Sequence, residues 1–130
     1  MIGLDTTAII DLFRGEPAIK RFLERSKEPL ATNIINHLEV HFGIEPSNPK
    51  HQKEAAYYDE FFRSTYFFTL TREASRRACE LHWQLKKRGT PISKLDSIIA
   101  ACFLENGVRK ILTRNARHFT HIKELKVVVY

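Results

Sequence analysis

The 130-residue chain, with 43% hydrophobic and 28% charged residues, has the length and composition of one soluble domain with its own core. Two cysteines exclude a disulfide framework, and no apolar run approaches the roughly 20 residues of a membrane span. The first residues lack a secretory pattern, so we expect a cytoplasmic protein, and the net charge of +6 fits either a polyanionic partner or plain solubility.

Predicted strands and helices alternate along the chain. Strands are expected at 2–5, 30–32, 66–70, 110–113 and 126–130, and helices at 8–13, 17–23, 34–42, 50–63, 72–88 and 94–105. Thr6 or Thr7 would cap the first helix, Asn33 the third and Ser93 the last. This alternation predicts an α/β fold with a central, mainly parallel sheet of about five strands, in a single domain over residues 1–130.

Three carboxylates lie beside apolar runs that belong in a core. Asp5 ends the first strand, Glu39 lies in an apolar helix, and Asp96 precedes an apolar run in another helix. A carboxylate buried alone is costly, so three of them suggest a shared cation, and Mg²⁺ is a hard ion that carboxylates bind well. Because sites in α/β sheets form beyond the carboxyl ends of the strands, we expect the three acids to converge at one edge of the sheet.

Each acid also has a purely structural interpretation. Asp5 could cap a helix, Asp96 could complement a helix dipole, and Glu39 could be a solvated side chain. Asn115 could cap the short helix that follows the fourth strand, or its amide oxygen could ligate a metal ion. Thr113 could orient a carboxylate or a water, although a threonine at a strand end needs no function. The joint placement of the acids favours a site.

Basic side chains precede the helix of Asp96 and flank Asn115. The candidates for contact with a nucleic-acid backbone are Lys87, Arg88, Lys94, Arg114 and Arg117. They could instead complement the dipoles of the helices at whose ends they lie, but we favour phosphate contact.

Two further patterns have mainly structural interpretations. His37 and His41 bracket Glu39, but at about 100° per residue Glu39 lies roughly 160° around the helix from each of them. One ion cannot readily use all three, so zinc is not expected. The aromatic-rich block at 57–68 is expected mostly in the core, with an excess that could cover a dimer or partner surface.

Four motifs resemble those of VapC-type toxins with a PIN domain. The motifs lie at 2–15 (IGLDTT and IDLFRG), 38–43 (LEV and FG), 95–101 (LDSIIAA) and 112–119 (LTRNARHF), in the family's order. The resemblance implies a PIN-like three-layer fold with helices on both faces of the sheet, a homodimer, a Mg²⁺- or Mn²⁺-dependent ribonuclease and a cognate VapB-like antitoxin. By motif, Asp5, Glu39 and Asp96 carry over as the metal site. The fourth motif, where family members often have another acid, holds Asn115 and His118 here.

The resulting hypothesis is metal-assisted hydrolysis of phosphodiester bonds in RNA. Asp5 and Asp96 would ligate Mg²⁺, Glu39 would hold a water or a second ion, and Asn115 would complete the shell. Thr6 and Thr113 are supporting residues. The alternatives are a nucleic-acid-binding module without catalysis, and a PIN nuclease that acts outside a toxin system, in RNA maturation or on DNA.

Overall fold

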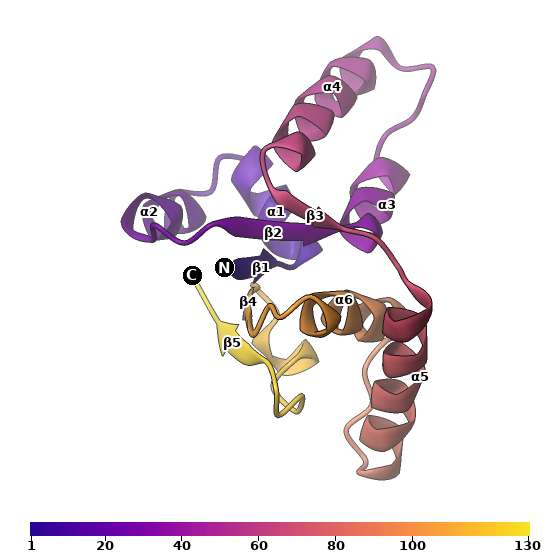
Figure 1. Ribbon diagram of the computed structural model, residues 1–130. Helices are drawn as coiled ribbons and strands as arrows, with labels where there is room; N and C mark the ends of the chain where they lie inside the picture. Colours follow the sequence, from indigo (N-terminus) through magenta and orange to yellow (C-terminus); the bar gives the residue numbers. More distant parts are fainter.

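The computed structural model describes residues 1–130, in which five parallel strands form one sheet of order β3-β2-β1-β4-β5 (Figure 1). The strands are β1 (Ile2–Leu4), β2 (Leu30–Asn33), β3 (Tyr66–Phe68), β4 (Lys110–Leu112) and β5 (Lys126–Val128). The helices are α1 (Thr6–Phe13), α2 (Pro17–Arg25), α3 (Ile34–Phe42), α4 (Pro49–Arg63), α5 (Arg72–Lys87) and α6 (Lys94–Glu105), with a 3₁₀ turn, η1, at Ala116–His118. The predicted α/β fold with five strands is confirmed.

The helices cover the sheet from two sides, as Figure 1 shows, with α1 to α4 on one side and α5 and α6 on the other. Alternate residues of the central strand serve the two layers: Ile2 and Leu4 belong to the core beneath α1 and α2, whereas Gly3 faces α6. A Cβ at Gly3 would lie 2.8 Å from the ring of Phe103, so this position requires glycine. Burial on both faces explains why β1 is an uninterrupted apolar run.

Several predicted element ends differ from the observed ones. Asp5, and neither Thr6 nor Thr7, caps α1, because the strand stops one residue early and the Asp5 carboxylate accepts the Thr6 backbone N–H. The strands at 66–70 and 126–130 each lose their last two residues, since the hydrogen-bonded ladder ends although β-branched or apolar residues continue. The caps Asn33 and Ser93 are confirmed.

The aromatic block is less buried than its composition predicts. Phe62 is the only one of its seven aromatic side chains that is fully buried, while Tyr57 and Tyr66 are exposed. The other four are half-buried and pack against the edges of the core. The expectation that most of the block lies in the core was therefore too strong, because α4 has a single buried residue and β3 is an edge strand of the sheet.

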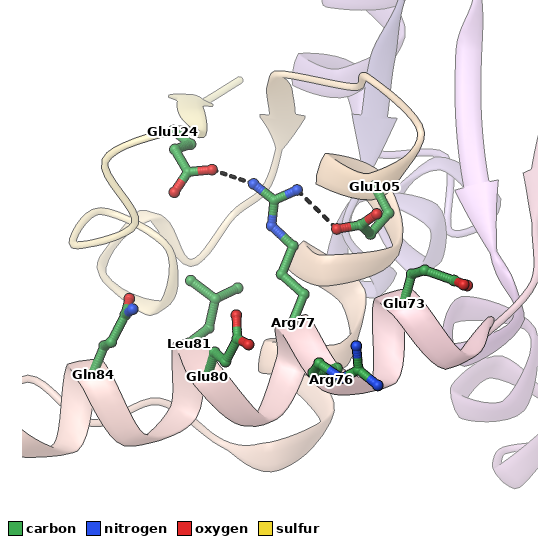
Figure 2. Close-up of a pocket in the computed structure, with 8 residues that line it drawn as sticks. All are labelled: Glu73, Arg76, Arg77, Glu80, Leu81, Gln84, Glu105 and Glu124. Carbon is green, nitrogen blue, oxygen red and sulfur yellow. Dashed lines mark hydrogen bonds and ion pairs between the residues drawn. The ribbon is translucent and has the colours of Figure 1, made fainter.

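A partly exposed ion-pair cluster links α5 to the end of α6 and to the loop before β5. Arg77 of α5 donates to Glu105 at the end of α6, at 3.1 Å, and to Glu124 in the loop before β5 (Figure 2). The cluster therefore joins three segments that are far apart in sequence.

None of the helices combines the length and the apolar character that crossing a bilayer requires.

Candidate active site

The site lies where the carboxyl ends of β1 and β4 meet. The two strands are paired, Leu4 opposite Leu112, and the Asp5 backbone N–H donates to the Leu112 carbonyl at 2.9 Å. Residues just beyond the two strands, Asp5 and Thr113, are therefore neighbours although 108 positions separate them. In this strand order the chain adds β2 and β3 on one side of β1, and β4 and β5 on the other. The gap between β1 and β4 is therefore the topological switch point, which is where α/β sheets bind ligands.

Asp5 is held by three neutral donors and is only 4% exposed. Its Oδ1 accepts the Thr6 N–H at 2.8 Å, and its Oδ2 accepts the hydroxyls of Thr113 at 2.8 Å and Thr7 at 2.9 Å. Burial raises the pKa of Asp5, the two hydroxyls oppose that rise, and the negative charge of Asp96 adds to it. No lysine or arginine bonds to this carboxylate, so its charge has no side-chain counterion.

Glu39 is positioned by a chain of hydrogen bonds that begins at the cap of α3. Asn33 and Asn36 form a capping box, and the buried Asn36 amide donates to the Thr6 hydroxyl at 3.1 Å. Thr6 in turn donates to Glu39 Oε1 at 2.5 Å. Burial raises the pKa of Glu39, the hydrogen bond from Thr6 opposes that rise, and the negative charges of Asp5 and Asp96 add to it. Glu39 therefore lies close enough to both acids to be repelled by them.

Asp96 enters from the first turn of α6, where the Ser93 hydroxyl accepts its backbone N–H at 3.1 Å. Its Oδ2 lies 3.1 Å from Nδ1 of His118, which belongs to η1. Asn115 precedes η1, and its side chain makes no capping bond, so the expected capping role is wrong. Its backbone N–H donates to the Thr113 hydroxyl at 2.9 Å, and Asn115 lines the same pocket as the three acids.

These side chains line one open pocket of about 380 Å³. Its lining comprises Asp5, Thr6, Thr7, Ile10, Glu39, Ser93, Asp96, Asn115 and His118. Three carboxylates, an amide and several hydroxyls gather there without a lysine or arginine, and this oxygen-rich donor set fits a hard divalent cation. The predicted convergence of the three acids, with Thr6 and Asn115 beside them and Thr113 behind Asp5, is what the structure has.

The predicted basic residues are placed less uniformly. Arg117 lines an adjoining hollow of about 540 Å³ that shares Asp96 and His118 with the acid pocket. Arg114 instead donates to the buried Asp11 carboxylate at 2.7 Å. Lys94 opens α6, and Lys87 and Arg88 are exposed at the end of α5, none of them in the lining of the acid pocket. Contact with a nucleic-acid backbone stays a prediction for all five.

Sequence reasoning missed two groups around the site. Thr7 binds Asp5, and its position two residues after a strand-end acid was a usable signal. Asp11 is 3% exposed and accepts from both Arg114 and the Tyr130 hydroxyl, the latter at 2.6 Å. Burial, followed by the bond to Asp11, raises the pKa of Tyr130. Only the spacing of Asp11 on the buried face of α1 hinted at this second buried acid.

Comparison with known proteins gives matches along nearly the whole chain. The family model for the PIN domain matches residues 2–125. Ribonuclease VapC19 of Mycobacterium tuberculosis is 27% identical over 126 residues, with 95% of each chain covered, and Ribonuclease VapC1 of Methanocaldococcus jannaschii is 30% identical over 129 residues, with 99% of this chain and 86% of that one covered. A chain of a toxin–antitoxin complex from Klebsiella pneumoniae has the same fold, with a TM-score of 0.78, 23% identity, and coverage of 98% and 96%.

Proposed function

The chain belongs to the PIN domain family, and from this premise we propose that it is a metal-dependent endoribonuclease, the toxin of a VapBC-type pair. Two relatives named as VapC ribonucleases support the reaction class. The single observation that carries the proposal is the convergence of Asp5, Glu39 and Asp96 on one pocket without a lysine or arginine.

Asp5, Asp96 and the amide of Asn115 would hold Mg²⁺ or Mn²⁺. The chemistry that such an ion supplies when bound is activation of water and stabilisation of charge on the phosphoryl oxygens. The fit rests on the donor set and on the buried carboxylate of Asp5, which has only neutral hydrogen-bond donors around it. Since Asn115 brings no charge, we propose one firmly held ion.

The remaining side chains would position the reactants. Thr6 occupies Oε1 of Glu39 and leaves Oε2 to accept a proton from the attacking water. Thr7 and Thr113 fix the Asp5 carboxylate, while His118 lies against Asp96 and limits its rotation. Arg117, in the adjoining hollow, would contact a phosphate of the bound RNA.

We also propose a VapB-like antitoxin as partner, since the Klebsiella pneumoniae relative in fold is part of a toxin–antitoxin complex. A groove of about 410 Å³ runs between α1, α3 and α4, and its lining includes Phe13, Tyr57 and Glu39. Phe13 and Tyr57 are exposed aromatic side chains, which suit an apolar partner segment. A segment bound there would reach the carboxylate of Glu39 and so close the acid pocket.

A homodimer in the cytoplasm is the remaining part of the proposal. Trp83 on α5 is more than half exposed beside an apolar groove shared with Ile98 of α6, which supports a self-association surface. Light scattering of the purified protein would give the oligomeric state, and a small upstream reading frame that encodes a DNA-binding protein would support the toxin role.

The deciding experiment is cleavage of labelled RNA by purified protein with Mg²⁺, with Mn²⁺ or with EDTA. We expect cleavage that EDTA stops, and its loss in Asp5→Asn and Asp96→Asn with unchanged circular dichroism. Glu60→Gln, an exposed acid on α4, is the matched control and should keep full activity. Full activity of pure Asp5→Asn would refute the mechanism.

One observation favours a second candidate, a nucleic-acid-binding module without catalysis. Asn115 brings an uncharged amide to the acid pocket, so that only three carboxylates supply negative charge for a metal ion. RNA binding that neither Mg²⁺ nor EDTA alters, without cleavage products, would support this candidate against the nuclease. A PIN nuclease outside a toxin system would cleave RNA or DNA but bind no cognate antitoxin.

A further inference from the structure

Two histidines and an aspartate form a cluster between α3 and α4. His37 and His41 lie one turn apart on α3, with ring centroids 4.0 Å apart and planes inclined by 22°. The Nε2 atom of each ring lies 3.8 Å from Oδ1 of Asp59 on α4. The three possible ligand atoms all lie within 4.8 Å of one another.

This cluster faces away from the acid pocket. Glu39, between the two histidines in sequence, turns to Thr6 and the sheet edge, while both imidazole rings turn toward α4. The structure therefore agrees with the helical geometry, which excludes a single ion bound by His37, Glu39 and His41 together. Asp59, 18 positions beyond His41, brings the oxygen atom that the sequence pattern did not indicate.

Hydrogen bonding does not account for the cluster. A separation of 3.8 Å is too long for a bond between imidazole and carboxylate, so neither ring is satisfied by Asp59. Nδ1 of His41, in contrast, lies 2.7 Å from the His37 carbonyl oxygen, which can only accept. Nδ1 therefore carries the proton, and in the neutral ring Nε2 presents its lone pair toward Asp59. A ring nitrogen fixed in this way by a backbone carbonyl is usual for metal-bound histidines.

We propose that His37, His41 and Asp59 form a second metal site, which takes Zn²⁺ through two imidazole nitrogens and one carboxylate oxygen. The donor set fits zinc better than magnesium, because imidazole suits zinc and magnesium prefers oxygen alone. With bonds of about 2.0–2.1 Å, tetrahedral ligand atoms lie roughly 3.4 Å apart. Each of the two separations of 3.8 Å between a histidine Nε2 and Asp59 Oδ1 therefore has to shorten by only about 0.4 Å. All three side chains are partly exposed, which leaves room for a water as fourth ligand.

The surroundings of the cluster favour the binding of an ion. The His37 ring packs against both Phe62 and Phe67, with centroids 5.3 and 6.2 Å away, and these contacts restrain its orientation. Asp59 is about half exposed and is free to adjust. An ion there would fasten α4, which has a single fully buried residue, to the helix that carries Glu39.

Zinc binding can be tested without RNA, so its outcome is independent of the proposed ribonuclease activity. The full chain, freed of any histidine tag, is titrated with ZnCl₂ by calorimetry, and its unfolding temperature is measured with Zn²⁺ and with EDTA. We expect one tight equivalent per chain that persists in Asp5→Asn, in which the acid pocket has lost a ligand, and an unfolding temperature higher by about 5 °C or more at saturation.

The variants locate the ion. His41→Ala and Asp59→Ala should each weaken zinc binding tenfold or more, and His41→Gln should do the same if the alanine variant folds poorly. Glu60→Ala, the neighbour of Asp59, and His121→Ala, an exposed histidine elsewhere, should bind like the wild type. Asp5→Asn should also retain this zinc equivalent.

Cobalt gives a spectroscopic check, because Co²⁺ bound tetrahedrally with imidazole absorbs strongly in the visible range. That absorption should disappear in His41→Ala and persist in Asp5→Asn. Absence of saturable zinc binding, affinity that His41→Ala leaves unchanged, or loss of binding in Asp5→Asn alone would each overturn the proposal.

Discussion

Replacement of Asp5 by asparagine should inactivate the protein and, in the absence of divalent ions, stabilise it. The carboxylate is buried, its pKa is raised by burial and by the charge of Asp96, and no cation bonds to it. An ionised carboxylate in such a place costs several kcal/mol, which the neutral amide of nearly equal shape removes.

The magnitude follows from the bonds at Asp5. Asparagine can keep the 2.8 Å bond from the Thr6 N–H, but its amino group meets the hydroxyls of Thr7 and Thr113, which must turn and accept. Each of these two bonds loses about 1 kcal/mol when the acceptor is no longer charged. The net gain is then about 1–2 kcal/mol. With an unfolding entropy of about 2.1 cal/mol/K per residue, this raises the unfolding temperature by roughly 4–7 °C.

Differential scanning calorimetry at neutral pH, with EDTA and then with excess Mg²⁺, provides the measurement. The wild type should gain stability with Mg²⁺ according to its affinity, whereas Asp5→Asn should gain little, so that the advantage of the variant shrinks or reverses. An Asp5→Asn protein that is destabilised in EDTA by 1 kcal/mol or more would refute the view that this carboxylate is an uncompensated charge.

Four further predictions concern pH, catalysis and packing. The pKa values of Asp5 and Glu39 are raised in the folded state above their ordinary 3.8 and 4.5, so folding takes up protons. The stability advantage of Asp5→Asn in EDTA should therefore be smallest near pH 4 and grow as the pH rises through the folded-state pKa of Asp5. Calorimetry at a series of pH values tests this. Thr6→Val should lower kcat about tenfold or more with little change in KM, since it frees Glu39, and Thr6→Ser should restore the rate. Gly3→Ala should cost about 1–3 kcal/mol in urea unfolding, because its methyl group would meet the Phe103 ring at 2.8 Å. Arg77→Met should lower stability by about 1 kcal/mol and leave RNA cleavage unchanged, and a change in kcat would contradict its purely structural role.

The main features of the acid pocket were predictable from local patterns. Asp5 and Asp96 lie beside apolar runs whose lengths identify a strand and a helix, and parallel topology sends strand ends to a common edge. Glu39 was predictable because a carboxylate among the apolar residues of a helix is costly to bury unless it has a partner. In each of these cases, a few neighbouring residues and one rule of sheet topology contain the information.

The parts that sequence reasoning did not predict depend on contacts between distant segments. Asp11 meets Tyr130 across 119 positions, and Asp59 meets His41 only because α4 folds back along α3. No local periodicity encodes such meetings, since they depend on helix packing angles and loop paths. The end of β3 escaped prediction for a different reason: Thr69 and Leu70 have strand propensity, but no neighbouring strand continues beside them.

The pairing of β1 with β4 also determines when the acid pocket can exist during folding. The central strand β1 is the first in the sequence, and of its two neighbours β2 follows soon after, whereas β4 comes more than 100 residues later. Local helices can form early, but the loop that brings Thr113 to Asp5 is among the longest that this chain can close, and its entropy opposes early closure. We therefore expect the acid pocket to form late in folding, so that a partly folded chain with native-like helices would still lack it.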